Sequence, residues 1–245
     1  MIRGLIFDIN GTLSEIWTNE EDESVWRMLS NFLIYQGIDM PAPAVRDAYF
    51  AKNQAQRRDS GEAFPEFDAV RLFSDILDDN ATGYTRRMPK KKRKQLPLTM
   101  AELFRAATLN RLELYDGVKK TLKKLKEKYR LAAVSDGQTA WAYPELHAVG
   151  LAGWFDPLIV SGDYGYRKPD KRLFLKALKK MNLRADEAVF VGNDLYRDVY
   201  GAAEAGMKTV FFKSNQGDHD YPARADCTIG KFSELAAAVR LLDER

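Results

Sequence analysis

The chain has 245 residues, of which 45% are hydrophobic and 30% are charged, a length and composition typical of a globular protein that is one domain or a core with an insertion. The 38 basic and 35 acidic residues leave a formal net charge of +3, too balanced to indicate nucleic-acid binding by the whole chain. No apolar run approaches the roughly 20 residues of a membrane-spanning helix, and the single cysteine, Cys227, excludes an internal disulfide.

The first predicted element is a strand over residues 2–7, an apolar run that ends at Asp8 and is followed by the turn residues Asn10, Gly11 and Thr12. Asp8 interrupts this run before it could form a secretory core, and no small-residue cleavage site follows. With the lone cysteine, this favours a cytoplasmic protein. A strand that ends in polar residues also indicates a functional site.

The next ninety residues are predicted to be helical. Apolar residues recur three and four positions apart, as in Val25, Met28, Leu29, Phe32 and Leu33, and again in Val70, Phe73, Ile76 and Leu77. We therefore predict a helical cap domain over residues 17–111, inserted into a core domain made of residues 1–16 and 112–245. The basic tract at residues 86–94 is interpreted as a solvated loop between cap helices, and not as a nucleic-acid site.

After the insertion, helical and strand patterns alternate. Helices are predicted over residues 117–129, 171–181 and 199–205, and they lead into strands over residues 131–134, 188–191 and 209–212 respectively. This alternation predicts an α/β fold, a doubly wound and mostly parallel Rossmann-like sheet with helices on both faces. Ligands of such sheets bind at the carboxyl ends of the strands, near the point where the strand order reverses.

The polar residues that follow the strands are therefore the candidate site. Asp8, Asn10, Gly11 and Thr12 follow the first strand, and a lysine, Lys168, stands in a loop before a helix. Further candidates follow the later strands: Ser135, Asp136, Gly137, Asn193, Asp194 and Asp198. Four separate loops are thus expected to bring carboxylates, a hydroxyl and an ammonium group to one edge of the sheet.

These residues also fall into four ordered motifs, at residues 7–13 (FDINGTL), 134–137 (VSDG), 167–170 (RKPD) and 191–194 (VGND) with Asp198. In this the chain resembles the haloacid dehalogenase superfamily, most of whose members are magnesium-dependent phosphatases that form an aspartyl-phosphate. The position of the insertion, between the first two motifs, resembles the branch with a helical cap that includes phosphoglycolate phosphatase-like and haloacid dehalogenase-like members.

The resemblance implies a role for each motif. Asp8 would be the nucleophile, and Mg²⁺ would be held by Asp8, the backbone carbonyl of Asn10 and an acidic residue of the fourth motif. Lys168 would balance the charge of Asp8 and the phosphate. The phosphoryl oxygens would be held by Ser135 and the neighbouring backbone, and Thr12 would fix the first loop. Thr12, Gly11, Asp136 and Gly137 are the expected substrate-binding residues. The substrate would be a small phosphorylated molecule.

Two positions depart from the family pattern. Phosphatases of the family carry a second aspartate two residues after the nucleophile, as the acid and base of the reaction; here that residue is Asn10, whose amide cannot exchange a proton near neutral pH. The family's metal aspartate often follows the glycine of the fourth motif directly, where this chain has Asn193. We expect Asp194 to replace it as the ligand, supported by Asp198.

Two alternatives to a working phosphatase stay open. One is metal-free displacement of halide from a 2-haloacid by the same nucleophile, which would leave the acidity of Asp194 and Asp198 without a purpose. The other is a catalytically impaired protein that binds a phosphorylated ligand without turning it over, which Asn10 and Asn193 favour. The sequence predicts neither the substrate nor the oligomeric state.

Overall fold

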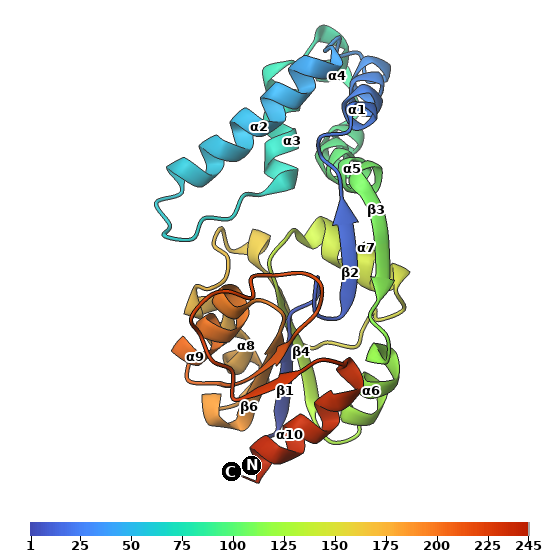
Figure 1. The fold of residues 1–245 in the computed structure, drawn as a ribbon. Helices are drawn as coiled ribbons and strands as arrows, with labels where there is room; N and C mark the ends of the chain where they lie inside the picture. The colour runs from blue at the N-terminus through green and yellow to red at the C-terminus, as the bar shows by residue number, and fades with distance from the viewer. Residues whose placement is uncertain (245) are drawn as a thin grey trace.

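The computed structural model describes residues 1–244 as a parallel α/β core beneath a helical cap (Figure 1). A six-stranded sheet forms the centre of the core, in the order β5-β4-β1-β6-β7-β8, with every neighbouring pair parallel. The strands are β1 (Gly4–Phe7), β4 (Arg130–Ser135), β5 (Leu158–Val160), β6 (Ala188–Gly192), β7 (Lys208–Phe212) and β8 (Cys227–Ile229). The predicted doubly wound, mostly parallel sheet is confirmed.

Both faces of the sheet are buried, which explains why its strands are almost continuously apolar. Successive side chains of a strand point to opposite faces: Leu5 and Phe7 pack into one hydrophobic cluster with helices α6 and α10, and Ile6 packs into a second with α8 and α9. The core helices are α6 (Val118–Leu125), α7 (Thr139–Ala148), α8 (Lys171–Met181), α9 (Gly201–Glu204) and α10 (Leu235–Asp243), with a π-helical turn at Leu195–Tyr200 ahead of α9.

The cap has a hydrophobic core of its own. Its helices are α1 (Glu23–Tyr35), α2 (Ala42–Asp59), α3 (Ala69–Asp79), α4 (Gly83–Arg87) and α5 (Lys90–Thr108). Fully buried aromatic side chains fill the space between them, with Tyr49 and Phe104 in contact at a ring separation of 4.5 Å. Trp141 of the core helix α7 joins this cluster, so the cap core extends down to the core domain.

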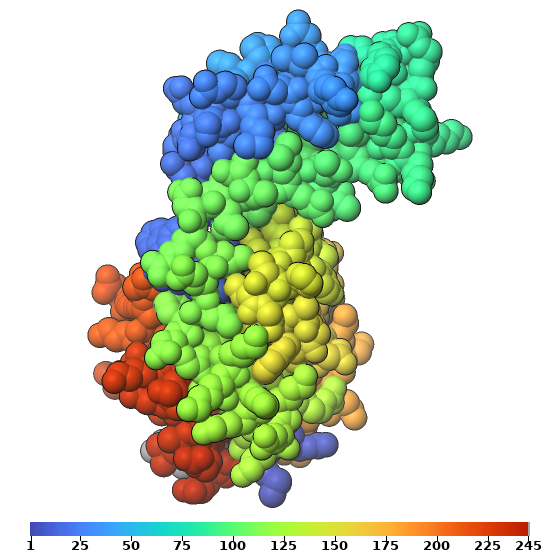
Figure 2. Space-filling view, turned by 90° about the vertical axis from the view of Figure 1, so that its right-hand side faces the viewer, coloured from blue at the N-terminus to red at the C-terminus, as the bar shows by residue number. Residues whose placement is uncertain are grey.

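A two-stranded antiparallel ribbon joins the cap to the core: β2 (Ser14–Thr18) pairs with β3 (Leu109–Leu114). The sequence-based boundaries after residues 16 and 111 fall inside these two strands, which periodicity did not predict. In the space-filling view the cap stands above the core (Figure 2), and the α2–α3 loop, residues 60–68, reaches down to the core again. There Glu66 N–H donates to the Gly165 carbonyl oxygen (2.9 Å).

The basic tract is not a loop as expected. Its first residues end α4 and Lys90–Lys94 form the start of α5, with Met88 buried between the two helices. The lysines and arginines are exposed, because the helix turns its apolar residues inward only from Leu96 onward. None of the helices within residues 1–244 is both long and apolar enough to cross a membrane.

Candidate active site

The four motifs meet at the carboxyl edge of the sheet, because β1, β4 and β6 are neighbours there. Asp8 follows β1, Ser135 ends β4, and Asn193 follows β6. Lys168, from the loop before α8, reaches into the same place, and its side chain is 2% exposed. The expectation that separate loops bring carboxylates, a hydroxyl and a lysine together at this edge agrees with the structure.

Lys168 forms the centre of the site. Its Nζ donates to Asp8 Oδ1 at 2.7 Å and to Asp198 Oδ1 at 2.6 Å. Burial alone would lower the pKa of the Lys168 ammonium, but the carboxylates of Asp198 and Asp8 outweigh it and raise that pKa above its ordinary value. Lys168 is therefore a fixed positive charge beside Asp8.

Asp198 is held by backbone as well as by Lys168. Its Oδ2 accepts the N–H groups of Asn193 (3.0 Å) and Asp194 (3.1 Å), and a Cβ at Gly192 would lie 2.3 Å from Asp198 Cβ, so only glycine leaves room for this arrangement. Desolvation raises the pKa of Asp198 to about 6; the Lys168 charge opposes the shift and the Asp8 charge adds to it.

The first loop brings Asp8 and Asn193 together through a hydroxyl. Thr12 Oγ1 lies 3.0 Å from Asp8 Oδ2 and 2.9 Å from Asn193 Oδ1. Gly11, at φ 90°, has a left-handed backbone conformation, and a Cβ there would lie 2.4 Å from Asn193 Nδ2. Gly11 thus lets the first loop pack directly on Asn193, whose Nδ2 donates to the Gln216 carbonyl oxygen at 2.8 Å.

Asp194 caps the π-helical turn and pairs with Arg197. Its carboxylate accepts the N–H groups of Tyr196 and Arg197, as the cap of the π-helical turn, and the Arg197 guanidinium binds it at 2.8 Å. Although desolvation opposes it, Arg197 lowers the pKa of Asp194 below its ordinary value. Asn193, and not Asp194, is therefore connected to Asp8 through Thr12, and the assignment of Asp194 as a metal ligand stays a prediction.

The second motif lines the site from β4. Ser135 is buried, with its Oγ 3.5 Å from the Asp136 carbonyl oxygen, and Asp136 Oδ1 accepts the Lys168 backbone N–H at 2.9 Å. Gly137 N–H donates to Ser161 Oγ at 2.9 Å. The other carboxylate oxygen, Asp136 Oδ2, is buried without a hydrogen-bond partner among the described residues.

Asn10 is held on both sides of its amide. Its Oδ1 accepts from Ser14 Oγ at 3.1 Å, and its Nδ2 donates to Glu145 Oε2 at 3.4 Å. Glu145 is buried on α7, and its other oxygen accepts from Arg105 Nε of the cap helix α5 at 2.6 Å. Neither Glu145 nor Arg105 is among the residues predicted from the sequence; the available signal is Trp141 and Glu145, four residues apart on a helix that begins just after the second motif.

A cavity of about 200 Å³ lies between the motifs and the cap. Asn10, Ser135, Asp136 and Gly137 line it from the core loops. The remaining lining residues come from the cap, from α7 and from the loops of the last two motifs: Arg57, Glu66, Phe67, Arg105, Gln138, Trp141, Ala142, Glu145, Arg167 and Arg197. Its size suits a small substrate.

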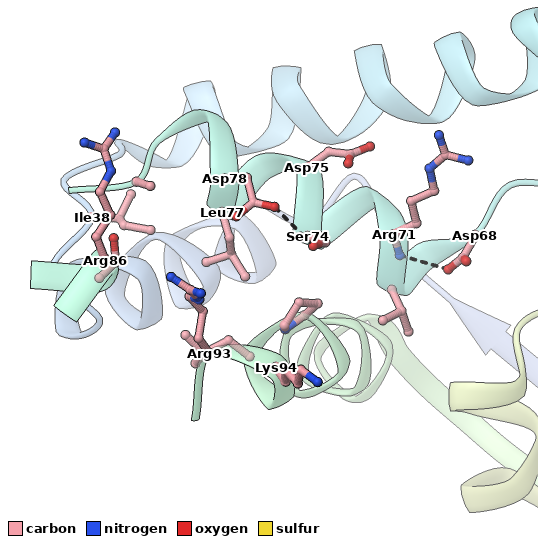
Figure 3. Close-up of a pocket in the computed structure, with 15 residues that line it drawn as sticks. Ile38, Asp68, Arg71, Ser74, Asp75, Leu77, Asp78, Arg86, Arg93 and Lys94 are labelled. Atoms are coloured by element: carbon pink, nitrogen blue, oxygen red, sulfur yellow. Dashed lines mark hydrogen bonds between the residues drawn. The ribbon is translucent and has the colours of Figure 1, made fainter. Parts of the chain in front are cut away.

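A larger cavity, of about 810 Å³, lies within the cap between α3 and α5 and includes none of the motif residues. Figure 3 shows Arg93 and Lys94 of α5 facing Leu77 and Ser74 of α3 across it. Because residues of the first two motifs, among them Asn10 and Ser135, line only the smaller cavity, we assign the chemistry to that one.

The parallel α/β core with an inserted helical cap, and the four motifs at one edge of its sheet, define a hydrolase with a capped α/β core. A family model described as haloacid dehalogenase-like hydrolase matches residues 2–206, and the chain belongs to this family. It is a hydrolase.

Two curated relatives and one solved structure illustrate the range of similar proteins. The glyceraldehyde 3-phosphate phosphatase of Methanocaldococcus jannaschii is 26% identical, with 99% of each chain covered. That of Pyrococcus furiosus is 37% identical over 123 residues, 49% of this chain and about half (51%) of the relative. The 2-haloacid dehalogenase of Pseudomonas syringae superposes with a TM-score of 0.67 at 21% identity, covering 98% of this chain and 99% of that one, and shows the shared fold.

Proposed function

We propose that the chain is a magnesium-dependent phosphatase that hydrolyses a small phosphorylated metabolite through an aspartyl-phosphate at Asp8. The observation that carries this proposal is the buried contact of Lys168 with Asp8 at 2.7 Å. A carboxylate can attack a phosphoryl group only where cations and hydrogen-bond donors offset the negative charge of both. Lys168 supplies such a charge beside the attacking oxygen.

The reaction uses the groups in two steps. An oxygen of Asp8 attacks phosphorus, the bond to the leaving oxygen breaks, and the aspartyl-phosphate forms. A water molecule then attacks the same phosphorus, releasing inorganic phosphate and restoring the Asp8 carboxylate. Ser135 and the neighbouring backbone would hold the phosphoryl oxygens, while Lys168 lies beside Asp8 as a fixed positive charge.

The oxygen donors present are of the kind that Mg²⁺ prefers. Asp8 and Asn193 converge on the Thr12 hydroxyl, and the backbone carbonyl of Asn10 and the Asp198 carboxylate are the other candidates. Within residues 1–244 no three His, Cys, Asp or Glu side chains gather as a metal-binding group, so amide and carbonyl oxygens would complete the set. When bound, the ion would offset phosphoryl charge.

The relatives support a small phosphorylated substrate. Both curated relatives described above carry the name of a phosphatase acting on a three-carbon phosphate, and a molecule of that size fits the cavity of about 200 Å³.

Asn10 favours a second candidate function: a protein that binds a phosphorylated ligand with little turnover. Its amide is held by Ser14 and Glu145, and it cannot donate a proton to the leaving oxygen or take one from water. General acid–base catalysis is worth roughly 10²- to 10⁴-fold, so hydrolysis of substrates with a poor leaving group would be slowed by up to that factor.

The test is phosphate release from acetyl phosphate, p-nitrophenyl phosphate and glyceraldehyde 3-phosphate, with Mg²⁺ and with a chelator, by the wild type and Asp8→Asn. A phosphatase releases phosphate only with Mg²⁺ and only with Asp8, and mass spectrometry detects phosphate on Asp8. Chloride released from 2-chloropropionate in the chelator would instead establish the metal-free dehalogenase. Ligand binding without release of either product would establish the binding protein.

A further inference from the structure

The active-site cavity is rich in arginine. Four arginines line the cavity, Arg57 and Arg105 from the cap and Arg167 and Arg197 from the core, against the three carboxylates Glu66, Asp136 and Glu145. A cavity with this excess of guanidinium groups attracts more negative charge than it contains.

Two of the four guanidinium groups each contact the protein through more than one nitrogen. Arg57 donates to Asn53 Oδ1, the Pro65 carbonyl oxygen and Glu66 Oε1, at 3.0, 3.2 and 3.0 Å. Arg197 binds the Asp194 carboxylate. These two therefore build the walls of the cavity.

Arg105 differs from these two, because its guanidinium is held in place through Nε alone. Nε donates to Glu145 Oε1 at 2.6 Å, and the guanidinium carbon lies 5.0 Å from the centre of the Trp141 ring. Among the described residues, its two Nη atoms make no hydrogen bond, while 16% of the side chain is exposed. A guanidinium positioned in advance by a carboxylate and an aromatic ring is well suited to bind an anion with two parallel hydrogen bonds.

The place of Arg105 relative to the motifs defines what it could bind. The phosphoryl group would lie at the floor of the cavity, on Ser135, whereas Arg105 comes from the cap. Only the Glu145 carboxylate stands between Arg105 and Asn10, at 2.6 Å from one and 3.4 Å from the other. Arg105 is thus within reach of the far end of a small molecule bound at Asp8.

We propose that Arg105 binds a second anionic group, a carboxylate or a second phosphate, at the end of the substrate away from the scissile phosphate. This inference rests on the proposed phosphatase activity and narrows its substrate class to phosphorylated acids or bisphosphates. Arg167, whose Nε lies 3.7 Å from Asp136 Oδ2, also makes no guanidinium hydrogen bond in the described chain. It adjoins Lys168, so it belongs to the phosphoryl end.

The test compares substrates that differ only in the second anionic group: 3-phosphoglycerate with glycerol 3-phosphate for a carboxylate, and ribulose 1,5-bisphosphate with ribulose 5-phosphate for a phosphate. For the wild type we expect the doubly anionic member of one pair to have a kcat/KM about 10- to 100-fold higher, the effect of charge-assisted hydrogen bonds. The pair that shows the preference identifies the anion.

In Arg105→Gln this preference should fall to about one, and Arg105→Lys should keep part of it. Because Arg105→Gln leaves Glu145 buried without its partner, the double variant Arg105→Gln with Glu145→Gln provides a second measurement should the single variant fold poorly. Arg93→Gln is the matched control: it removes the same charge from the same helix at an exposed position, and it should keep the preference.

Equal kcat/KM values within both pairs, or a preference that persists in Arg105→Gln, would overturn the inference while leaving the phosphatase activity in place. A preference lost in Arg167→Gln but kept in Arg105→Gln would overturn it as well. If no compound is hydrolysed, the proposed function fails, and calorimetric titration of the Asp8→Asn variant with the same four compounds still decides whether Arg105 selects for the second anion.

Discussion

Lys168 Nζ lies 2.7 Å from Asp8 Oδ1, although the two residues are 160 positions apart in the chain. The contact spans the whole cap insertion and depends on the first and third motifs meeting at one edge of the sheet. It connects stability with chemistry, since the same ammonium that compensates two buried carboxylates stands beside Asp8, the proposed nucleophile.

Lys168→Met should therefore destabilise the protein as well as inactivate it. Removing one member of a buried ion pair typically costs about 3–5 kcal/mol, because the partner charges are left uncompensated. Urea unfolding at pH 7 would measure the loss. The loss should be smaller at pH 5, below the raised pKa of about 6 of Asp198, where that carboxyl group is protonated; an equal loss at both pH values would show that packing, and not charge, is what Lys168 contributes.

Asn10→Asp should raise the turnover of substrates with poor leaving groups. The new carboxyl group would sit where Asn10 now contacts Ser14 and Glu145, and it can transfer the proton that an amide cannot. We expect an increase in kcat of roughly 10²- to 10⁴-fold for glycerol 3-phosphate and a much smaller one for acetyl phosphate, whose leaving group needs little protonation. A similar increase for both substrates would contradict the assignment of the proton transfer to this position.

Gly11→Ala should disturb the site through Asn193. A Cβ at residue 11 would lie 2.4 Å from Asn193 Nδ2, at a backbone φ of 90°, so we expect a loss of about 1–3 kcal/mol in stability and weaker Mg²⁺ binding, measured by calorimetry. Gly61→Ala is the control for backbone strain alone, because Gly61 has a φ of 71° and no atom within 4 Å of its Cβ position. It should lose stability with no change in Mg²⁺ binding.

Asp198 should make stability fall as pH rises. Desolvation raises its pKa from 3.8 to about 6, so between these values the folded protein holds a proton that the unfolded chain has released. The free energy of unfolding then decreases through this window, by up to roughly 3 kcal/mol from this group. Urea unfolding of the wild type and Asp198→Asn from pH 4 to 7, in a chelator, would show a flatter profile for the variant; parallel profiles would refute the assignment.

Gln138 should hold the cap loop against the core. Its side chain accepts the Ala69 N–H at 2.9 Å and donates to the Phe67 carbonyl oxygen at 2.7 Å. Gln138→Leu leaves both buried groups without a partner, at about 1–3 kcal/mol each. Hydrogen exchange should increase at residues 66–69 before the rest of the cap; unchanged exchange there would mean that other contacts hold the loop.

Several parts of the fold could be predicted because their signals are local. Strands buried on both faces are continuous apolar runs, which is why those ending at Phe7, Val134 and Val191 were found. The ribbon of β2 and β3 was missed, since its partially exposed strands pair only across the cap insertion. The sequence predicts a loop at Lys90–Lys94, where the structure has a helix, because five consecutive basic residues contain no apolar residues at helical spacing.

The sequence by itself determined the order of the four motifs and the places of Asp8 and Lys168 in them, because each motif lies in a short segment whose spacing is set by the chain. The tertiary structure alone decided which side chains meet. Asp194 was preferred over Asn193 for its charge, yet Arg197 binds Asp194 while Thr12 connects Asn193 to Asp8. Arg105 reaches Glu145, the hydrogen-bond partner of Asn10, only because the cap folds back over the sheet. Such contacts depend on the direction of side chains from distant segments, which no local pattern in the sequence records.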